Sequence, residues 1–174
     1  SKADADAVLP PEKRFRPVGA TWSRVQLEAL PGLHLHDLMQ LSIDRLRRFF
    51  DVAWDDVYSG LFHTLKNVDD NVWEVFKAQY LQAEMLVGLM LVIEHTGAEW
   101  AKEYFGRLYP YVRAKFPLKQ YGFPLWIDYA DRKVTFERHA NRAENFHHPR
   151  HLMRNLASLE RMIKRKGKAS GIWG

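Results

Sequence analysis

The sequence contains no cysteine. This absence excludes disulfide bonds, thiolate nucleophiles and metal sites built on cysteine ligands. No apolar stretch approaches the ~18 residues that a transmembrane helix requires, so we expect no membrane contact through such a segment. The first residues, SKADADAVLPPEKRF, also lack the apolar region of a signal peptide. We therefore expect a cytoplasmic protein.

Two phosphate-binding patterns are missing as well, G-x-G-x-x-G and G-x-x-x-x-G-K-[ST]. We therefore expect no nucleotide-binding fold. The net charge is +5, and residues 132–168 hold eleven Lys and Arg against three Asp and Glu. A basic end of this kind can bind nucleic acid. Because no nucleic-acid-binding motif accompanies these charges, we expect no nucleic-acid partner.

What is present is typical of one globular domain. The chain has 174 residues, of which 47% are hydrophobic and 13% aromatic. Apolar residues recur at helical spacing in four segments: 36–50, 72–95, 98–115 and 149–164. Short strands are expected around 54–65, and as a hairpin within 121–134. This order predicts an all-α fold, a helical toroid whose helices are joined at one end by short β-hairpins.

The two ends of the chain differ from this middle part. Residues 1–35 contain four prolines, and we expect them to form an extended arm. Residues 166–174 follow a run of Lys and Arg, and we expect a basic, flexible tail. The folded part is therefore expected over residues 36–165.

Histidines are the main candidates for chemistry, because their ordinary pKa lies closest to neutrality. His139, His147, His148 and His151 lie within thirteen residues. They are interpreted in three ways: a metal site, a surface cluster without a role, or acid–base groups at the edge of a pocket. The metal-binding pattern H-E-x-x-H is absent.

Four short motifs carry a resemblance to a known family. They are Trp54–Phe62 (WDDVYSGLF), Lys77–Glu84 (KAQYLQAE), Trp126, and Phe146–Arg150 (FHHPR). Their order and spacing resemble the N-acylglucosamine 2-epimerase and cellobiose 2-epimerase family over residues 38–164. The resemblance implies the C-terminal half of an (α/α)6 barrel. It also implies a sugar 2-epimerase or aldose–ketose isomerase that acts on a reducing sugar without a metal or another cofactor.

The resemblance also implies roles for individual residues. His147 corresponds to the family's C-terminal catalytic histidine, which moves a proton through an enediolate intermediate. Four residues would bind the sugar: Tyr80, Glu84, Trp126 and Arg150. A second base is needed, and His34 or His36 is the candidate in this sequence, with His34 and Asp37 at an H-x-x-D spacing.

The sequence departs from the family in two respects. The family's two tryptophans are Gln79 and Tyr80 here, and a glycine is Ser59, so the substrate can differ. The family's barrels are also much longer than this chain. A second chain, a second copy of this chain, or a missing first half would complete the barrel, and we expect a partner chain.

Two other functions remain open. The chain can be a catalytically inactive sugar-binding or regulatory protein on the same toroid. It can also be a hydrolase or lyase of glycans, although Glu84 and Asp128 form no evident catalytic pair in the sequence.

Overall fold

The computed structural model describes residues 35–118, 125–135, 143–144 and 146–171. The predicted N-terminal arm, except for Leu35, lies outside the described residues, and so do His34 and His139. The chain divides into two compact units, residues 1–42 and 43–174. The described part of the first unit is the beginning of helix α3 (Leu35–Ala53). The second unit contains all the other described elements.

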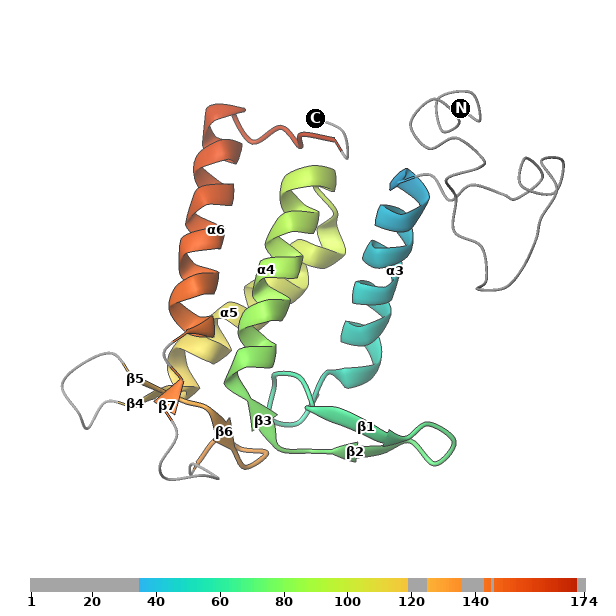
Figure 1. Cartoon of the computed structure of the whole chain (residues 1–174), viewed down its shortest axis with the longest axis vertical. Helices are drawn as coiled ribbons and strands as arrows, with labels where there is room; N and C mark the ends of the chain where they lie inside the picture. Colours follow the sequence, from blue (N-terminus) through green and yellow to red (C-terminus); the bar gives the residue numbers. More distant parts are fainter. Residues whose placement is uncertain (1–34, 119–124, 136–142, 145, 172–174) are drawn as a thin grey trace, which may run out of the picture. The chain divides into compact units, whose positions relative to one another are not determined.

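The described chain is mostly helical, and helices make up 59% of it. The helices after α3 are α4 (Gln79–Thr96), α5 (Glu99–Lys115) and α6 (His147–Lys164). The predicted helices over 36–50, 98–115 and 149–164 are confirmed, with small differences at their ends. α4 packs against both α5 and α6 (Figure 1).

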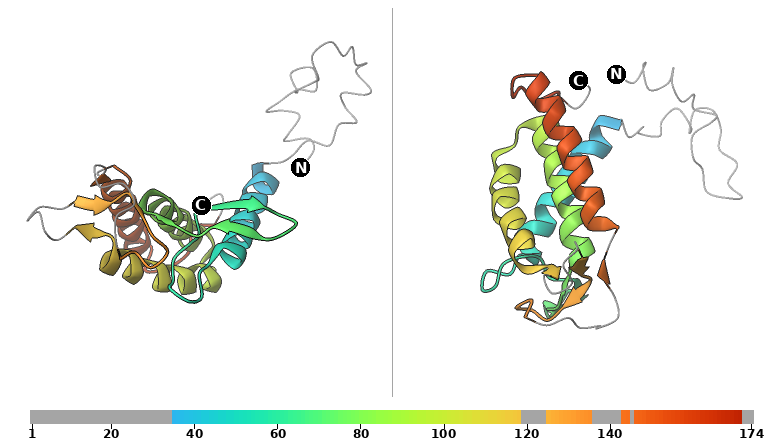
Figure 2. Two further views of the ribbon diagram at one scale, coloured as in Figure 1. Left: turned by 90° about the horizontal axis from the view of Figure 1, so that it is seen from below. Right: turned by 90° about the vertical axis from the view of Figure 1, so that its left-hand side faces the viewer.

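Short antiparallel strands gather at one end of α4 and α6 (Figures 1 and 2). β1 (Thr64–Asn67) pairs with β2 (Val72–Glu74), and β3 (Lys77–Ala78) pairs with β6 (Tyr129–Ala130). β5 (Leu125–Ile127) lies between β4 (Pro117–Leu118) and β7 (Ala143–Glu144). Strands therefore connect the helices at the end where α4 begins.

Two expectations about these strands were wrong in detail. The helix predicted from residue 72 begins only at Gln79, because residues 72–74 and 77–78 pair as strands. The two strands expected to form a hairpin within 121–134 do not pair with each other. β5 pairs with β4 and β7, whereas β6 pairs with β3.

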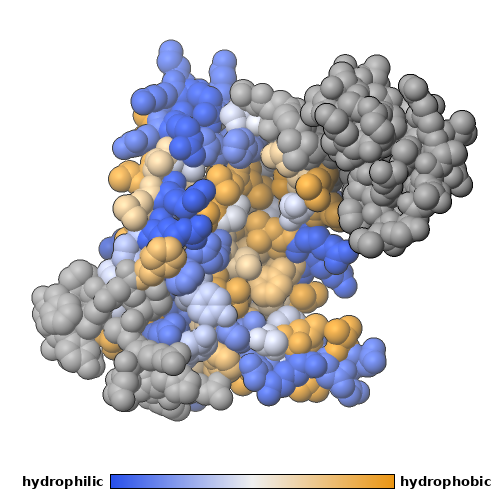
Figure 3. All heavy atoms as spheres, in the orientation of Figure 1, coloured by the Kyte–Doolittle hydropathy of each residue, from blue (hydrophilic) through white to orange (hydrophobic). Residues whose placement is uncertain are grey.

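The hydrophobic core is built mainly from α3, α4 and α5. Phe50, Leu86, Leu108, Val112 and Phe116 are fully buried in it. α4 carries apolar residues on all sides, a composition typical of a helix surrounded by others. It ends at Gly97, whose φ of 69° is the left-handed conformation that glycine adopts readily. Apolar residues also gather on the surface along α4 (Figure 3).

An ion cluster of Asp55, Lys77 and Arg132, in which the Asp55 and Lys77 side chains are buried and Arg132 is partly exposed, ties the segment after α3 to the start of α4. Lys77 Nζ lies 3.1 Å from Asp55 Oδ2, and Arg132 donates two hydrogen bonds of 2.8 Å to the same carboxylate. Although burial opposes ionisation, Arg132 and Lys77 hold the pKa of Asp55 well below its usual value. Three segments distant in the sequence are thereby fixed around one carboxylate.

Gln82 makes a second connection between the same two segments. Its Oε1 accepts a hydrogen bond from the Leu61 amide, and its Nε2 donates one to the Leu61 carbonyl, both at 2.9 Å. The Gln82 side-chain amide thus bonds to both the N–H and the C=O of Leu61, as the backbone of a neighbouring strand would. Asp55, Lys77 and Gln82 all belong to the family-like motifs, and here they shape the backbone around the start of α4.

α6 has an unusual distribution of side chains. Its buried residues are polar: His148, His151, Asn155 and Ser158. Its exposed surface carries a line of large apolar residues at helical spacing: Leu152, Leu156, Leu159 and Ile163. A soluble helix normally shows the opposite distribution. This apolar line on α6 is the kind of surface that another protein element covers.

Residues 166–171 turn back toward the end of α4. The Ser170 amide donates to the Glu94 carbonyl at 3.0 Å, and the Ser170 hydroxyl lies 2.7 Å from His95 Nδ1. In the described part of the chain, no helix has the length and apolar character needed to cross a membrane. The strands, α4 and the start of α6 form the setting of the candidate site.

Candidate functional site

The beginning of α4 presents two different faces. Gln82 points into the core, where it holds Leu61, and it is fully buried. Tyr80 and Glu84 are four residues apart, so they lie one helical turn apart on the same face of α4, which differs from the face that carries Gln82. Both are only partly buried. This second face meets the first turn of α6 and forms the candidate site.

Glu84 connects α4 to two residues of α6. Its Oε1 lies 2.9 Å from His147 Nδ1, and the same oxygen accepts a hydrogen bond from Arg150. Partial burial opposes ionisation of Glu84. The bonds from Arg150 and His147 outweigh it and hold the pKa of the carboxyl below its ordinary value. Glu84 is therefore a carboxylate at neutral pH.

This geometry selects one form of His147. A carboxylate only accepts hydrogen bonds, so the proton of a neutral His147 ring sits on Nδ1. The basic lone pair is then on Nε2, on the other side of the ring. The His147 side chain is 33% exposed, so the ring is only partly buried. A histidine held in one tautomer by a carboxylate is a common arrangement for general acid–base catalysis.

Tyr80 lies next to His147 and contacts a second histidine, His63. The Tyr80 and His147 ring centroids are 5.5 Å apart, and the Tyr80 hydroxyl lies 2.8 Å from His63 Nε2. Burial, followed by the nearby Tyr129, raises the pKa of Tyr80. Its hydroxyl therefore stays protonated and can donate a hydrogen bond. Two imidazole rings thus flank one phenol.

Aromatic rings support this arrangement from the strand side. His63 stacks on Phe76 with ring centroids 4.4 Å apart, and Tyr129 lies 6.1 Å from Tyr80. Flat apolar rings beside hydroxyl and imidazole groups are typical of sites for ligands with both C–H and O–H surfaces.

Trp126 occupies a neighbouring position. It stacks on His148 with ring centroids 4.0 Å apart, and His148 Nδ1 lies 3.0 Å from Gln79 Nε2. Burial, with a smaller effect from His151, lowers the pKa of His148 to about 4. His148 is therefore neutral at neutral pH. Trp126 and Gln79 thus pack against the residue that follows His147 in α6.

The structure brings together four residues proposed from the sequence, namely Tyr80, Glu84, His147 and Arg150, and places Trp126 beside them against His148. His34, the proposed second base, lies outside the described residues. Among the residues that the structure does describe, no group of three or more potential ligands is placed to hold a metal ion.

The sequence interpretation missed His63. This residue reaches Tyr80 only because the turn between β1 and β2 reverses the chain, so that the His63 amide bonds to the Glu74 carbonyl. His63 lies within the segment 54–65 in which short strands were expected, and a polar residue in that segment was the only available signal. It gave no indication that His63 lies near Tyr80.

No model of a known protein family matches this chain, and no curated protein sequence matches it. The resemblance drawn from the four motifs therefore remains an expectation.

Proposed function

We propose that this chain acts on a reducing sugar as a 2-epimerase or an aldose–ketose isomerase. The observation that carries the proposal is the Glu84–His147 hydrogen bond, which orients an imidazole next to Tyr80. The family resemblance names the chemistry, and the geometry supplies a base, an oriented hydroxyl and aromatic surfaces. No cofactor is needed for this reaction.

The reaction begins with removal of a proton from C2, which is weakly acidic because it lies next to the carbonyl carbon. His147 Nε2 takes this proton, and the C–H electron pair forms the C1–C2 double bond of an enediolate. The Tyr80 hydroxyl donates a hydrogen bond to the oxygen on which negative charge develops. Acid–base catalysis of this kind typically contributes 10²–10⁴-fold to the rate.

The second half of the reaction determines the product. A proton returned to C2 on the opposite face gives the epimer, and a proton returned to C1 gives the ketose. His63, linked to Tyr80, is the second acid–base group that we propose in place of His34. Its imidazole reaches the site from the strand side, whereas His147 comes from α6.

We also propose that the fold is half of an (α/α)6 barrel. Strands lie between α3 and α4 and between α5 and α6, whereas α4 leads directly into α5, and this order of helix pairs joined by strands agrees with such an architecture. The exposed apolar line on α6, Leu152, Leu156, Leu159 and Ile163, supports a further helical layer on that side. A second chain or a second copy of this chain would supply it.

The proposal is tested by proton NMR in D₂O with the native protein and a panel of reducing sugars. Deuterium at C2, or at C1 of a ketose product, is expected with the wild-type protein and is expected to be lost in His147→Asn. His95→Asn, at the other end of α4, is the matched control. Undiminished exchange in His147→Asn would exclude His147 as the base.

A second candidate function is sugar binding without catalysis, favoured by Gln79 and Tyr80 at the family's tryptophan positions. Tight sugar binding without any deuterium incorporation would support it. The native mass of the same folded sample distinguishes this outcome from an incomplete half-barrel, which would be monomeric and would bind no sugar.

A further inference from the structure

The histidine on the strand side of Tyr80 has a carboxylate neighbour of its own. His63 Nδ1 lies 3.6 Å from Glu74 Oε2, within ion-pair distance, and 2.5 Å from the Thr64 hydroxyl. The other ring nitrogen, His63 Nε2, lies 2.8 Å from the Tyr80 hydroxyl. The imidazole is therefore placed between a carboxylate on one side and a phenol on the other.

The hairpin of β1 and β2 builds this arrangement. The His63 amide donates to the Glu74 carbonyl, and Thr64 lies opposite Glu74 in the strand register. Side chains of directly opposite residues share one face of a strand pair, so the Thr64 and Glu74 side chains both reach His63 Nδ1. Lys66 Nζ holds the other carboxylate oxygen, Glu74 Oε1, at 2.8 Å. The hairpin thus fixes Glu74 with its second oxygen toward the imidazole.

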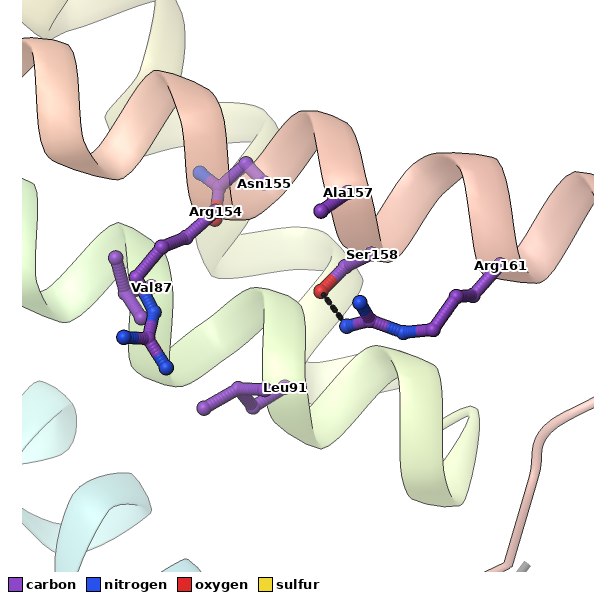
Figure 4. A pocket seen from close by; sticks show the side chains of 7 residues that line it. All are labelled: Val87, Leu91, Arg154, Asn155, Ala157, Ser158 and Arg161. Carbon is purple, nitrogen blue, oxygen red and sulfur yellow. Dashed lines mark hydrogen bonds between the residues drawn. The ribbon is translucent and has the colours of Figure 1, made fainter.

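Glu74 differs from a carboxylate that only joins helices. In the groove between α4 and α6, Arg161 donates one hydrogen bond to Ser158 (Figure 4) and two to the Glu94 carboxylate. Glu94 therefore faces a guanidinium, which is always charged in proteins. Glu74 faces a histidine, the residue type that gains or loses a charge near neutral pH. A change of charge on His63 is thus coupled to Glu74.

The charge of His63 decides what the Tyr80 hydroxyl can do, because a hydroxyl has a single proton. A neutral His63 with its proton on Nδ1 accepts the Tyr80 hydrogen bond through Nε2. A charged His63 instead donates through Nε2 to the Tyr80 oxygen, and the Tyr80 proton is then available to the sugar. Because burial raises the pKa of Tyr80, the phenol gives up its proton only when another group replaces it.

The charged and titratable groups around His63 come from four elements. Asp128, which precedes β6, acts on Tyr80 and contributes to its raised pKa, after burial and Tyr129. The groups around His63 itself are Lys66 on β1, Glu74 on β2, Tyr80 on α4 and Tyr129 on β6. Glu74 is the carboxylate among them that lies at His63 Nδ1, so it is the group that stabilises a charged imidazole there.

We propose that Tyr80, His63 and Glu74 form a proton relay, in which Glu74 is the positioning residue that stabilises the charged form of His63. In the return step of the epimerisation, the Tyr80 O–H bond breaks and a C2–H bond forms from the electron pair of the enediolate. The His63 Nε2–H bond breaks as the Tyr80 O–H bond forms again, which leaves His63 neutral. Water then returns a proton to His63 and removes the one that His147 took. The relay rests on the proposed function, because it supplies the second acid–base group of that reaction.

A reversible epimerisation requires a second group that can remove a proton as well as return it. A phenol with a raised pKa is a poor base by itself. His63 Nε2 accepts the phenolic proton while the Tyr80 oxygen takes the proton from C2. Glu74 then faces an imidazolium, the role that a carboxylate has in a catalytic triad. The same three side chains therefore serve both directions of the reaction.

The first measurement is NMR of the full chain labelled with ¹⁵N, which reports the protons on the His63 ring nitrogens; His63→Gln identifies their signals. Glu74→Gln is expected to lower the ratio of charged to neutral His63 near pH 6.5 by about two- to fivefold, the usual effect of one partly exposed ion pair. Glu99→Gln is the matched control, because Glu99 also pairs with a lysine, Lys102, and it is expected to leave the ratio unchanged.

The second measurement is deuterium incorporation at the sugar in the same variants. Glu74→Gln is expected to lower kcat in proportion to the loss of charged His63, about two- to fivefold, and to leave KM unchanged. This split is expected because Glu74 acts through His63 and does not touch the sugar. A purely structural role of Glu74 would not link kcat to the charge of one imidazole.

The relay is overturned by an unchanged His63 ratio in Glu74→Gln, or by an equal change in Glu99→Gln. Undiminished deuterium incorporation in Glu74→Gln would retain the enzyme and reject the relay, even where the His63 ratio has fallen. A lower His63 ratio in Glu74→Gln, with no deuterium incorporation by the wild-type protein, would retain the Glu74–His63 pair and reject the epimerase or isomerase. The NMR measurement does not depend on turnover, so the two failures are distinguishable.

Discussion

His147 Nδ1 lies 2.9 Å from Glu84 Oε1, although 63 residues separate the two in the sequence. The carboxylate joins the first turn of α6 to the second turn of α4 and fixes the imidazole in one tautomer. Arg150 binds the same oxygen, so Glu84 holds a base and a cation in place together. The candidate chemistry depends on this one side chain more than on any other positioning group.

Removal of the Glu84 charge is expected to slow catalysis without unfolding the protein. In Glu84→Gln the amide can present an N–H to His147 Nδ1, which disfavours the productive tautomer. We expect a loss in kcat of up to about 10⁴-fold, the size found when a carboxylate that fixes the tautomer of a catalytic histidine is replaced by its amide. Deuterium exchange at the sugar measures the rate, and circular dichroism checks the fold. An unchanged rate would show that Glu84 does not orient the base.

Tyr80→Phe is expected to lower turnover while leaving stability nearly unchanged. The substitution keeps the ring that packs near His147 but removes the hydroxyl that bonds to His63. His63→Gln should have a comparable effect if the two residues act together, and the double variant should lose little more than either single one. Tyr109→Phe on α5 is the control. Fully additive effects would indicate that His63 and Tyr80 work independently.

Asp55→Asn is expected to destabilise the fold strongly. The Lys77 and Asp55 side chains are fully buried, and loss of the carboxylate leaves the Lys77 charge without its partner. Breaking a buried ion pair in this way costs about 3–5 kcal/mol. Urea unfolding measures the free energy. The double variant Asp55→Asn with Lys77→Met should recover part of the loss, and a wild-type free energy in Asp55→Asn alone would contradict the role of the cluster.

Stability is expected to fall as the pH drops from about 6.5 to about 4, because of His148. Burial lowers the pKa of His148 to about 4, so in this range the unfolded chain binds a proton that the folded chain does not. A shift of this size corresponds to about 3 kcal/mol. The loss of stability caused by His148 is absent above about pH 6.5 and complete below about pH 4.

Urea unfolding across this pH range measures the His148 contribution. In His148→Gln the dependence of the unfolding free energy on pH should be smaller by up to one proton. His95→Gln is the matched substitution at the other end of α4. The assignment is wrong if wild type and His148→Gln show the same slope.

Local patterns in the sequence predicted the helices but not how the strands pair. Apolar spacing was sufficient for α3, α5 and α6, because each of these helices has a repeating pattern. The start of α4 was misplaced because Lys77 and Ala78 pair with Ala130 and Tyr129, more than fifty residues later. No property of residues 72–78 indicates that partner.

The sequence motifs predicted which residues belong to the candidate site, but not how these residues contact one another. Glu84 and His147 were chosen from two separate motifs, and only the packing of α4 on α6 shows that they touch. Lys77 and Gln82 belong to the same motif as Tyr80 and Glu84, but the motif does not indicate that Lys77 and Gln82 hold the backbone instead of lying at the candidate site. Gln82 faces the core and Tyr80 and Glu84 face α6, although all three lie near the start of α4. The apolar pattern of α4 does not indicate which of its faces points to the core, because apolar residues lie on all sides of the helix.

The position of α6 in the chain has a consequence for synthesis. His147 and Arg150 come from this helix, the last one described, while their partner on α4, Glu84, is made much earlier. Because domains form as the chain leaves the ribosome from the N-terminal side, α4 and the strand cluster emerge before α6 can dock. A nascent chain therefore has Glu84, Tyr80 and His63 before it has His147, and the Glu84–His147 hydrogen bond forms only after α6 has emerged.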